Sequence, residues 1–144
     1  STSTYTFIGA ATSEPALDFG YGGAQNGLFA YSASDGNKIG QGTASTSYGA
    51  SFATGDIMGI ALDMDGGTIT FYKNGSTQGQ AFSGITGDIA PWITGYSNKN
   101  EYNFGSPPYA VSSGNTDANG FGNFEYAPPS GYFALCTKNL AEYG

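Results

Sequence analysis

The sequence predicts an all-β fold, an antiparallel β-sandwich, and two observations carry that prediction. Short apolar runs recur along the 144 residues, and Gly-, Pro- and Asn-rich turn signals separate them, as in sandwiches and barrels. The best helix formers are scarce, with five Leu, four Lys, four Glu and no Arg, whereas there are eleven Tyr and ten Phe. This length suits a single domain over residues 1–144, which we expect to be a fragment of a longer chain.

The first two expected strands are Tyr5–Ala10 and Leu28–Ser32. Ser13-Glu14-Pro15 ends the first strand, and Gln25-Asn26-Gly27 immediately precedes the second. Residues of these types mark the ends of strands, because Gly and Asn adopt the backbone angles of turns and Pro lacks the N–H that strand pairing needs.

A β-hairpin over residues 57–64 and 68–73 is the clearest unit of the sequence. Alternate positions from Met58 to Met64 are apolar, and the residues between them are apolar or small up to Ala61. Both faces of this strand are therefore expected to be covered. Ile69 and Phe71 share a face of the return strand, and Asn74-Gly75 is the strongest short signal for a hairpin turn.

Three further strands are expected nearer the C-terminus, and no stretch shows a convincing helical period. The expected strands are Ala90–Thr94, Glu101–Phe104 and Gly131–Thr137.

The charge balance excludes several functions. The net charge is −7, with four Lys and no Arg, so the phosphate neutralisation that nucleic-acid binding needs is missing. The absence of His excludes Ser-His-Asp and Cys-His catalysis. No signal peptide or apolar run long enough to span a bilayer is visible, so membrane insertion is not expected.

Carboxylate catalysis also finds no support in the residue spacing. Glycosidases need two carboxyl groups that flank the scissile bond, but the four Glu lie far apart at positions 14, 101, 125 and 142. Asp63 and Asp65 share a strand face, but they precede Gly66-Gly67, where Asp favours a turn. The chain is therefore expected not to be an enzyme.

The hairpin carries a family resemblance. A Gly55-Asp56 pair opens a strand that ends in Leu62-Asp63, and the return strand ends in Phe71-Tyr72-Lys73-Asn74-Gly75, which resembles the signature hairpin of SPRY domains. Pro91 and Asn103-Phe104-Gly105 are similar to the family's next landmarks. Residues 128–140, from Pro128-Pro129 to Leu140, resemble the C-terminal end of SPRY domains in bacteriophage structural proteins.

The resemblance implies a bent sandwich of two antiparallel sheets, with a concanavalin-like jelly-roll architecture and no catalytic activity. It also implies partner binding through loops at one end of the sandwich. Two departures stand out. The family's opening strand with a Trp-Glu pair is missing, so either Tyr5–Ala10 replaces it or it lies upstream, and residues 107–123 resemble an inserted loop.

Part of this inserted loop has the oxygen spacing of a calcium site. Asn115, Asp117 and Asn119 alternate before Gly120, as the ligands of a calcium loop do. However, the first position of this calcium-loop pattern is Asn115 and not Asp, and the twelfth is Tyr126 and not Glu. The loop therefore carries little negative charge with which to bind a divalent ion. Asn, Asp and Gly also dominate ordinary turns, and an ordinary loop is the favoured alternative to a calcium-stabilised one. No other cofactor is expected.

The loop is long for a compact sandwich, and long loops are usually functional. We expect it to form a binding rim whose candidate residues are Tyr96, Asn98, Lys99, Asn100, Asn115, Asp117, Asn119 and Phe121. Aromatic and amide side chains suit neutral sugars or protein surfaces, whereas the charge of −7 disfavours acidic ligands at low salt.

The expected function is non-enzymatic binding in a phage structural protein such as a tail fibre, located in the virion. Its partners would be host-surface glycans or proteins, or other virion proteins. A purely structural decoration or spacer domain is the alternative, and a eukaryotic-type SPRY adaptor is a third.

Overall fold

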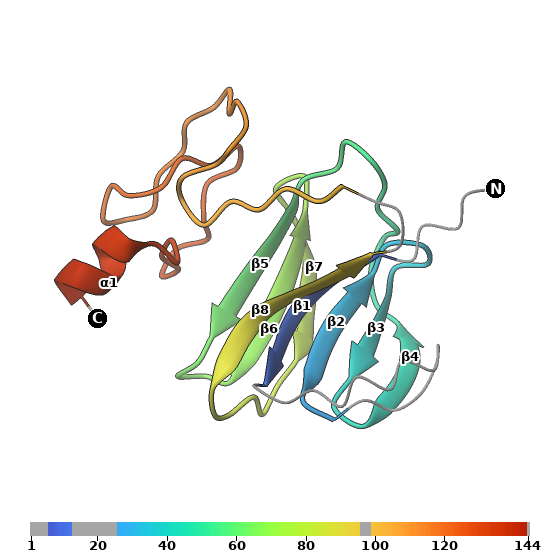
Figure 1. The fold of residues 1–144 in the computed structure, drawn as a ribbon. Coiled ribbons are helices and arrows are strands. Elements are labelled where there is room, and N and C mark those ends of the chain that lie inside the picture. The colour runs from blue at the N-terminus through green and yellow to red at the C-terminus, as the bar shows by residue number, and fades with distance from the viewer. Residues whose placement is uncertain (1–5, 13–25, 96–98, 144) are drawn as a thin grey trace. The chain divides into compact units, whose positions relative to one another are not determined.

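The computed structural model describes residues 6–12, 26–95 and 99–143. The chain divides into two compact units, Ser1–Asn98 and Lys99–Gly144, each of which is described below by itself. The first unit contains every strand named here, and the second contains the short helix α1 (Figure 1).

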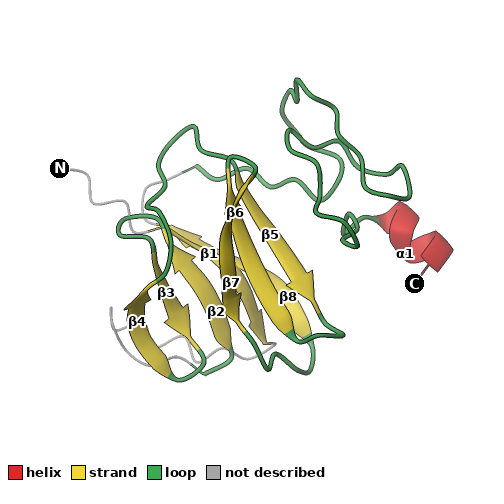
Figure 2. Ribbon diagram, turned by 180° about the vertical axis from the view of Figure 1, so that it is seen from behind, coloured by secondary structure: helices red, strands yellow, loops and turns green. Residues whose placement is uncertain are grey.

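Two antiparallel sheets make up the first unit, which confirms the predicted β-sandwich (Figures 1 and 2). One sheet has five strands in the order β4-β3-β2-β1-β8, and the other has three in the order β5-β6-β7. The strand bounds are β1 Thr6–Thr12, β2 Leu28–Ser32, β3 Asn37–Gly40, β4 Thr43–Ser47, β5 Met58–Asp63, β6 Thr68–Lys73, β7 Ser76–Phe82 and β8 Ile89–Gly95.

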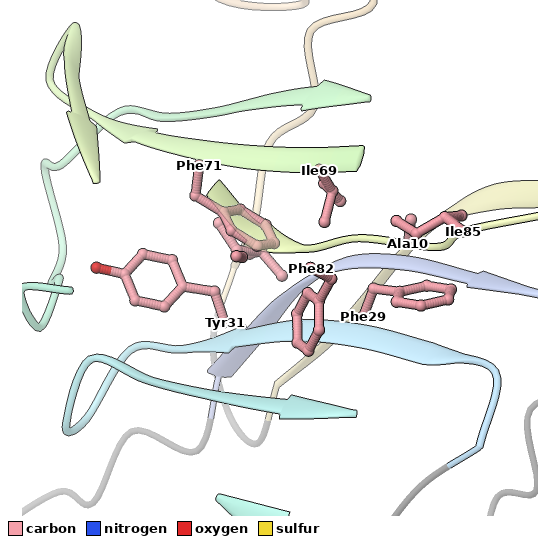
Figure 3. Close-up of a cluster of buried hydrophobic side chains, with 9 residues drawn as sticks. Ala10, Phe29, Tyr31, Ile69, Phe71, Phe82 and Ile85 are labelled. Atoms are coloured by element: carbon pink, nitrogen blue, oxygen red, sulfur yellow. The ribbon is translucent and has the colours of Figure 1, made fainter. Parts of the chain in front are cut away.

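The hydrophobic core lies between the two sheets (Figure 3). Phe29 and Tyr31 of β2 face Ile69 and Phe71 of β6, and the Tyr31 and Phe71 ring centroids are 5.2 Å apart. Tyr31, Ile69 and Phe71 are fully buried. Period-two alternation of strand side chains produces this layer, because residues two apart share a face of the sheet.

A smaller apolar cluster covers the opposite face of the five-stranded sheet. Ala11, Leu28 and Ala30 are buried there, and Phe7 and Trp92 pack against them. β2 is consequently buried on both faces, which explains why its sequence is almost continuously apolar.

The predicted hairpin is confirmed, since β5 and β6 pair from Met58↔Lys73 to Asp63↔Thr68. The Asp63 carboxylate accepts a hydrogen bond from the Gly66 N–H at 2.8 Å, so this residue has a turn role. Asn74 and Gly75 have φ values of 49° and 78°, as expected of the Asn-Gly turn that joins β6 to β7.

The expectation that both faces of β5 are covered holds only in part, since Ala61 is buried but much of the strand is not. Met58 and Leu62 pack against the core, but Ile57, Ile60 and Met64 are exposed. Among the described residues β5 pairs only with β6, so it is an edge strand with an incomplete cover.

The sequence analysis missed three polar strands, β3, β4 and β7. The Thr- and Ser-rich strand β4 has no apolar alternation, and its side chains are mostly exposed. β3 and β4 are joined by a tight turn at Gln41-Gly42, where both residues have positive φ.

The described residues of the second unit contain no extended strand, so the strands predicted at Glu101–Phe104 and Gly131–Thr137 are wrong. At the first, the Asn103 side chain binds the Gly105 N–H and the Asn123 carbonyl. At the second, side chains bind both the N–H and the carbonyl of Ala134. Such side-chain bonds replace the ladder that a strand would need.

The chain ends in helix α1, Thr137–Tyr143, which no periodicity in the sequence predicted. None of the helices in the described part of the chain has the length and apolar character required to cross a bilayer.

Candidate functional site

Most of the predicted rim residues lie in the second unit. Lys99, Asn100, Asn115, Asp117, Asn119 and Phe121 belong to it, whereas Tyr96 and Asn98 lie outside the described residues.

The second unit is organised around the carboxylate of Asp117, a residue only 7 % exposed. Its Oδ1 accepts hydrogen bonds from the backbone N–H groups of Asn119 at 3.0 Å and Phe121 at 2.9 Å. Its Oδ2 accepts from the Ala134 N–H at 2.8 Å and from Asn139 Nδ2 at 2.7 Å. One carboxylate thus joins the loop, the segment before α1 and α1 itself.

The electrostatics of Asp117 favour its ionised form. Burial by itself would raise the pKa of this carboxyl group, but the four hydrogen bonds outweigh it and hold the pKa below its ordinary value. A carboxylate has about four lone-pair sites, and N–H donors occupy that number here.

This geometry favours the ordinary loop over the calcium loop. Asn115 forms a bridge with Phe124, and its amide donates to the carbonyls of Phe124 and Glu125. Asn119 donates to Asn139 Oδ1 at 2.8 Å. In the part of the chain that the structure describes, no three acidic or Cys side chains gather into a cation site.

The Glu125 carboxylate joins the C-terminal end of the loop to Ser112 and Ser113. It accepts hydrogen bonds from the Ser112 N–H at 2.8 Å, from the Ser112 hydroxyl and from the Ser113 hydroxyl at 2.9 Å. These bonds lower the pKa of Glu125 to about 2. The segment from Ser112 to Glu125 is therefore held together by its own polar side chains.

The other predicted residues are only partly brought together. The Lys138 ammonium lies over the Phe121 ring, 5.7 Å from its centroid. Lys99 pairs with Glu101 at 2.8 Å on an exposed surface, and no hydrogen bond within the described residues joins Lys99 or Asn100 to the loop.

The sequence analysis missed an exposed aromatic pair beside this loop. Tyr102 and Phe104 stack with centroids 6.2 Å apart and planes 20° apart, and both are nearly half exposed. Asn103, between them, donates to the Asn123 carbonyl at 2.7 Å and so ties the pair to the loop end. The sequence signal that could have indicated this pair is two aromatic residues, two positions apart, in an Asn-rich stretch.

In the first unit, the end of the hairpin is held by a polar network. Asn74 Nδ2 donates to Asp56 at 2.7 Å, and Lys73 forms an ion pair with Asp56 at 3.2 Å. The hydrogen bond from the Ala53 N–H is the main cause that lowers the Asp56 pKa, followed by the Asn74 bond. The network fixes the segment before β5 against the β6–β7 turn.

The first unit also has a groove of about 350 Å³ between β3–β4 and β7. In β7 and directly after it, the carbonyls of Gly79, Ala81 and Ser83 accept hydrogen bonds from side chains of the five-stranded sheet and its loops. The donors, in the same order, are the Tyr48 hydroxyl, Lys38 Nζ and Gln41 Nε2. The residues that line the groove are Lys38, Gly40, Gln41, Thr43, Thr46, Gln80, Ala81, Phe82 and Ser83.

Comparisons with protein families and with solved structures both find relatives of this chain. The family model described as "SPRY domain" matches residues 1–107. The crystal structure of the SPRY domain of human HERC1 is similar to the chain, with 28 % identity and a TM-score of 0.54. That match covers 67 % of this chain and 58 % of the HERC1 chain.

Proposed function

Since the chain belongs to the SPRY domain family, we propose that it is a non-catalytic binding module of a bacteriophage structural protein that recognises the host surface. SPRY domains are protein-interaction modules, which supports a binding role in general. The phage context and the host surface as partner are the specific part of the proposal.

The observation that carries the proposal is the exposed Tyr102–Phe104 pair beside an ordered polar loop. Rigid aromatic rings offer contact area at a low cost in conformational entropy, and neighbouring amides offer adaptable hydrogen bonds. Asn100 supplies an amide next to the rings in the sequence. Since the loop is already held by Asp117 and Glu125, little ordering is needed on binding.

The phage assignment rests on the resemblance of residues 128–140 to the ends of SPRY domains in phage structural proteins. The family model matches residues 1–107, so this C-terminal stretch lies outside the match. The net charge of −7 favours a neutral glycan or a protein surface over an acidic polymer.

Binding of the fluorescently labelled chain to bacterial cells and to a glycan array tests the proposal. We expect the double substitution Tyr102→Ala with Phe104→Ala to reduce binding about tenfold or more, the usual effect of removing an aromatic anchor. Tyr143→Ala is the matched control, since Tyr143 is also an exposed aromatic of the second unit but lies in α1. Equal binding by both variants would contradict the proposal.

A structural spacer is the second candidate. Phe133, Leu135, Leu140 and Tyr143 are all more than half exposed, and apolar side chains of this kind suit contact with a neighbouring virion protein. Failure of the wild-type chain to bind any cell or glycan would favour the spacer.

The third candidate, a eukaryotic-type adaptor, is supported by the likeness to the human HERC1 SPRY domain. The genes that neighbour the coding sequence distinguish it from the first two, since virion genes would exclude an adaptor.

A further inference from the structure

The groove between β3–β4 and β7 holds a lysine whose charge the described residues do not balance. Lys73 and Lys99 form ion pairs with Asp56 and Glu101 at 3.2 and 2.8 Å. No carboxylate of the described residues lies within 4.0 Å of Lys38 Nζ. In a chain with seven more acidic than basic residues, this arrangement leaves a positive centre inside a polar groove.

The ammonium group of Lys38 retains capacity to donate hydrogen bonds. Of its three N–H donors, one binds the Ala81 carbonyl at 2.5 Å. The group also lies 5.3 Å from the centroid of the Phe82 ring and 5.8 Å from that of Tyr48. These contacts fix the position of the charge and leave two N–H donors without an acceptor among the described residues.

The rest of the lining is uncharged. Its polar side chains are the amides of Gln41 and Gln80 and the hydroxyls of Thr43, Thr46 and Ser83, and Gly40, Ala81 and Phe82 complete it. One cation among neutral donors matches a single carboxylate better than a phosphate dianion, which usually meets several cationic or backbone donors. The groove volume of about 350 Å³ is at the lower end of the range for ligand sites and accommodates one side chain of a partner.

We propose that this groove binds an Asp or Glu side chain from an extended segment of a partner protein, whose carboxylate accepts hydrogen bonds from Lys38. The walls are mostly strand, with β3 and β4 on one side and the end of β7 on the other, so the groove suits an extended segment. The long-range repulsion from the net charge does not prevent this contact, because the Debye length is about 8 Å at physiological ionic strength. The inference rests on the proposed binding function and names a second contact for it.

Nuclear magnetic resonance titration of the ¹⁵N-labelled chain tests the groove. The probes are acetyl-Gly-Glu-Gly-amide and its uncharged partner acetyl-Gly-Gln-Gly-amide. We expect saturable shifts of the groove amides with the Glu peptide, and affinity about tenfold lower for the Gln peptide, the range expected for a charge-assisted hydrogen bond. Equal affinity for the two peptides would overturn the inference.

Substitutions localise the binding. Lys38→Met removes the charge and retains most of the stem, so it should abolish the preference for the Glu peptide. Lys138→Met is the matched control, because Lys138 also lies over a ring and has no carboxylate within 4.0 Å among the described residues. A preference that survives Lys38→Met would assign the shifts to another site and overturn the inference.

Lys38 also joins the two sheets, so a second variant guards against a loss of folding. Thr46 is exposed on β4, and Thr46→Trp should fill the groove while leaving the Lys38–Ala81 bond intact. We expect it to abolish peptide binding in a folded protein. The Tyr102→Ala, Phe104→Ala variant should retain peptide binding, so failure of the groove and failure of the proposed host recognition give different results.

Discussion

At the scale of single residues, Asp117 shows how a polar side chain can take the place of a hydrophobic core. The sequence predicted a binding rim that includes Asp117, with cation binding as one alternative for its loop. Its partners Ala134 and Asn139 lie 17 and 22 residues further along the chain. Local spacing carries no information about donors that distant, so the structural role was not predictable from the sequence.

Asp117→Asn should destabilise the second unit. The new amide NH₂ would face an N–H donor in place of an acceptor, and a buried donor left unsatisfied costs about 1–3 kcal/mol. Hydrogen exchange of the amides between residues 115 and 140 measures the effect. Asp65→Asn, at an exposed turn position, is the control and should leave exchange unchanged. Unchanged protection in Asp117→Asn would refute the role of the carboxylate.

Calcium is expected to have no effect on the melting temperature. A ligand that binds only the folded state would raise it by mass action, but N–H donors already occupy the Asp117 lone pairs. Thermal melting with millimolar calcium and with a chelator checks this. A rise with calcium that disappears in Asp117→Asn would establish the calcium loop instead.

At the scale of elements, apolar alternation located the strands that build the core. β1, β2, β5, β6 and β8 were all predicted to within about two residues, because each contributes side chains to a buried layer. β3, β4 and β7 have mostly polar sequences without apolar alternation, although Ala81 and Phe82 at the end of β7 are buried in the core. Their pairing is set by neighbouring strands, so tertiary context decides them. In the second unit, side-chain hydrogen bonds to the backbone likewise take the place of the two predicted strands.

The two strands of the β5–β6 hairpin should contribute unequally to the free energy of unfolding. Phe71 is fully buried, and Phe71→Ala should cost about 3–5 kcal/mol of unfolding free energy. Leu62 is half-buried against the core, so Leu62→Ala should cost less. Ile60→Ala is the control, since Ile60 is exposed and the change should cost well under 1 kcal/mol. Chemical denaturation gives all three values, and a Phe71→Ala cost no larger than that of Ile60→Ala would contradict this account.

At the scale of the whole molecule, the two units are stabilised by different means. The first buries two apolar clusters, whereas the described residues of the second bury only Asp117, Ala134 and Asn139. Composition predicted one aromatic-rich sandwich and gave no sign of a unit with a polar centre. Aromatic content alone does not distinguish buried rings such as Phe71 from exposed ones such as Phe104.

Deletion of residues 113–120 tests this division. The deletion removes Asp117 and Asn119, so we expect the backbone amides of residues 99–143 to lose protection from hydrogen exchange. The sandwich should keep its melting transition, because its core residues all lie in the first unit. Fluorescence of Trp92, the single Trp of the sequence, in β8, and hydrogen exchange of residues 99–143 report on the two units separately. Loss of both signals together would show that the units fold as one.

The row of occupied carbonyls on β7 also bears on how copies of the chain behave at high concentration. An open strand edge is a template for pairing with another chain, and such pairing leads to aggregation. Side chains from β3, the β3–β4 turn and the segment after β4 already bind the carbonyls of Gly79, Ala81 and Ser83. An incoming strand would have to displace all three donors before it could pair with this part of the edge. The contacts that shape the groove therefore also protect the protein from edge-to-edge polymerisation where many copies are crowded together.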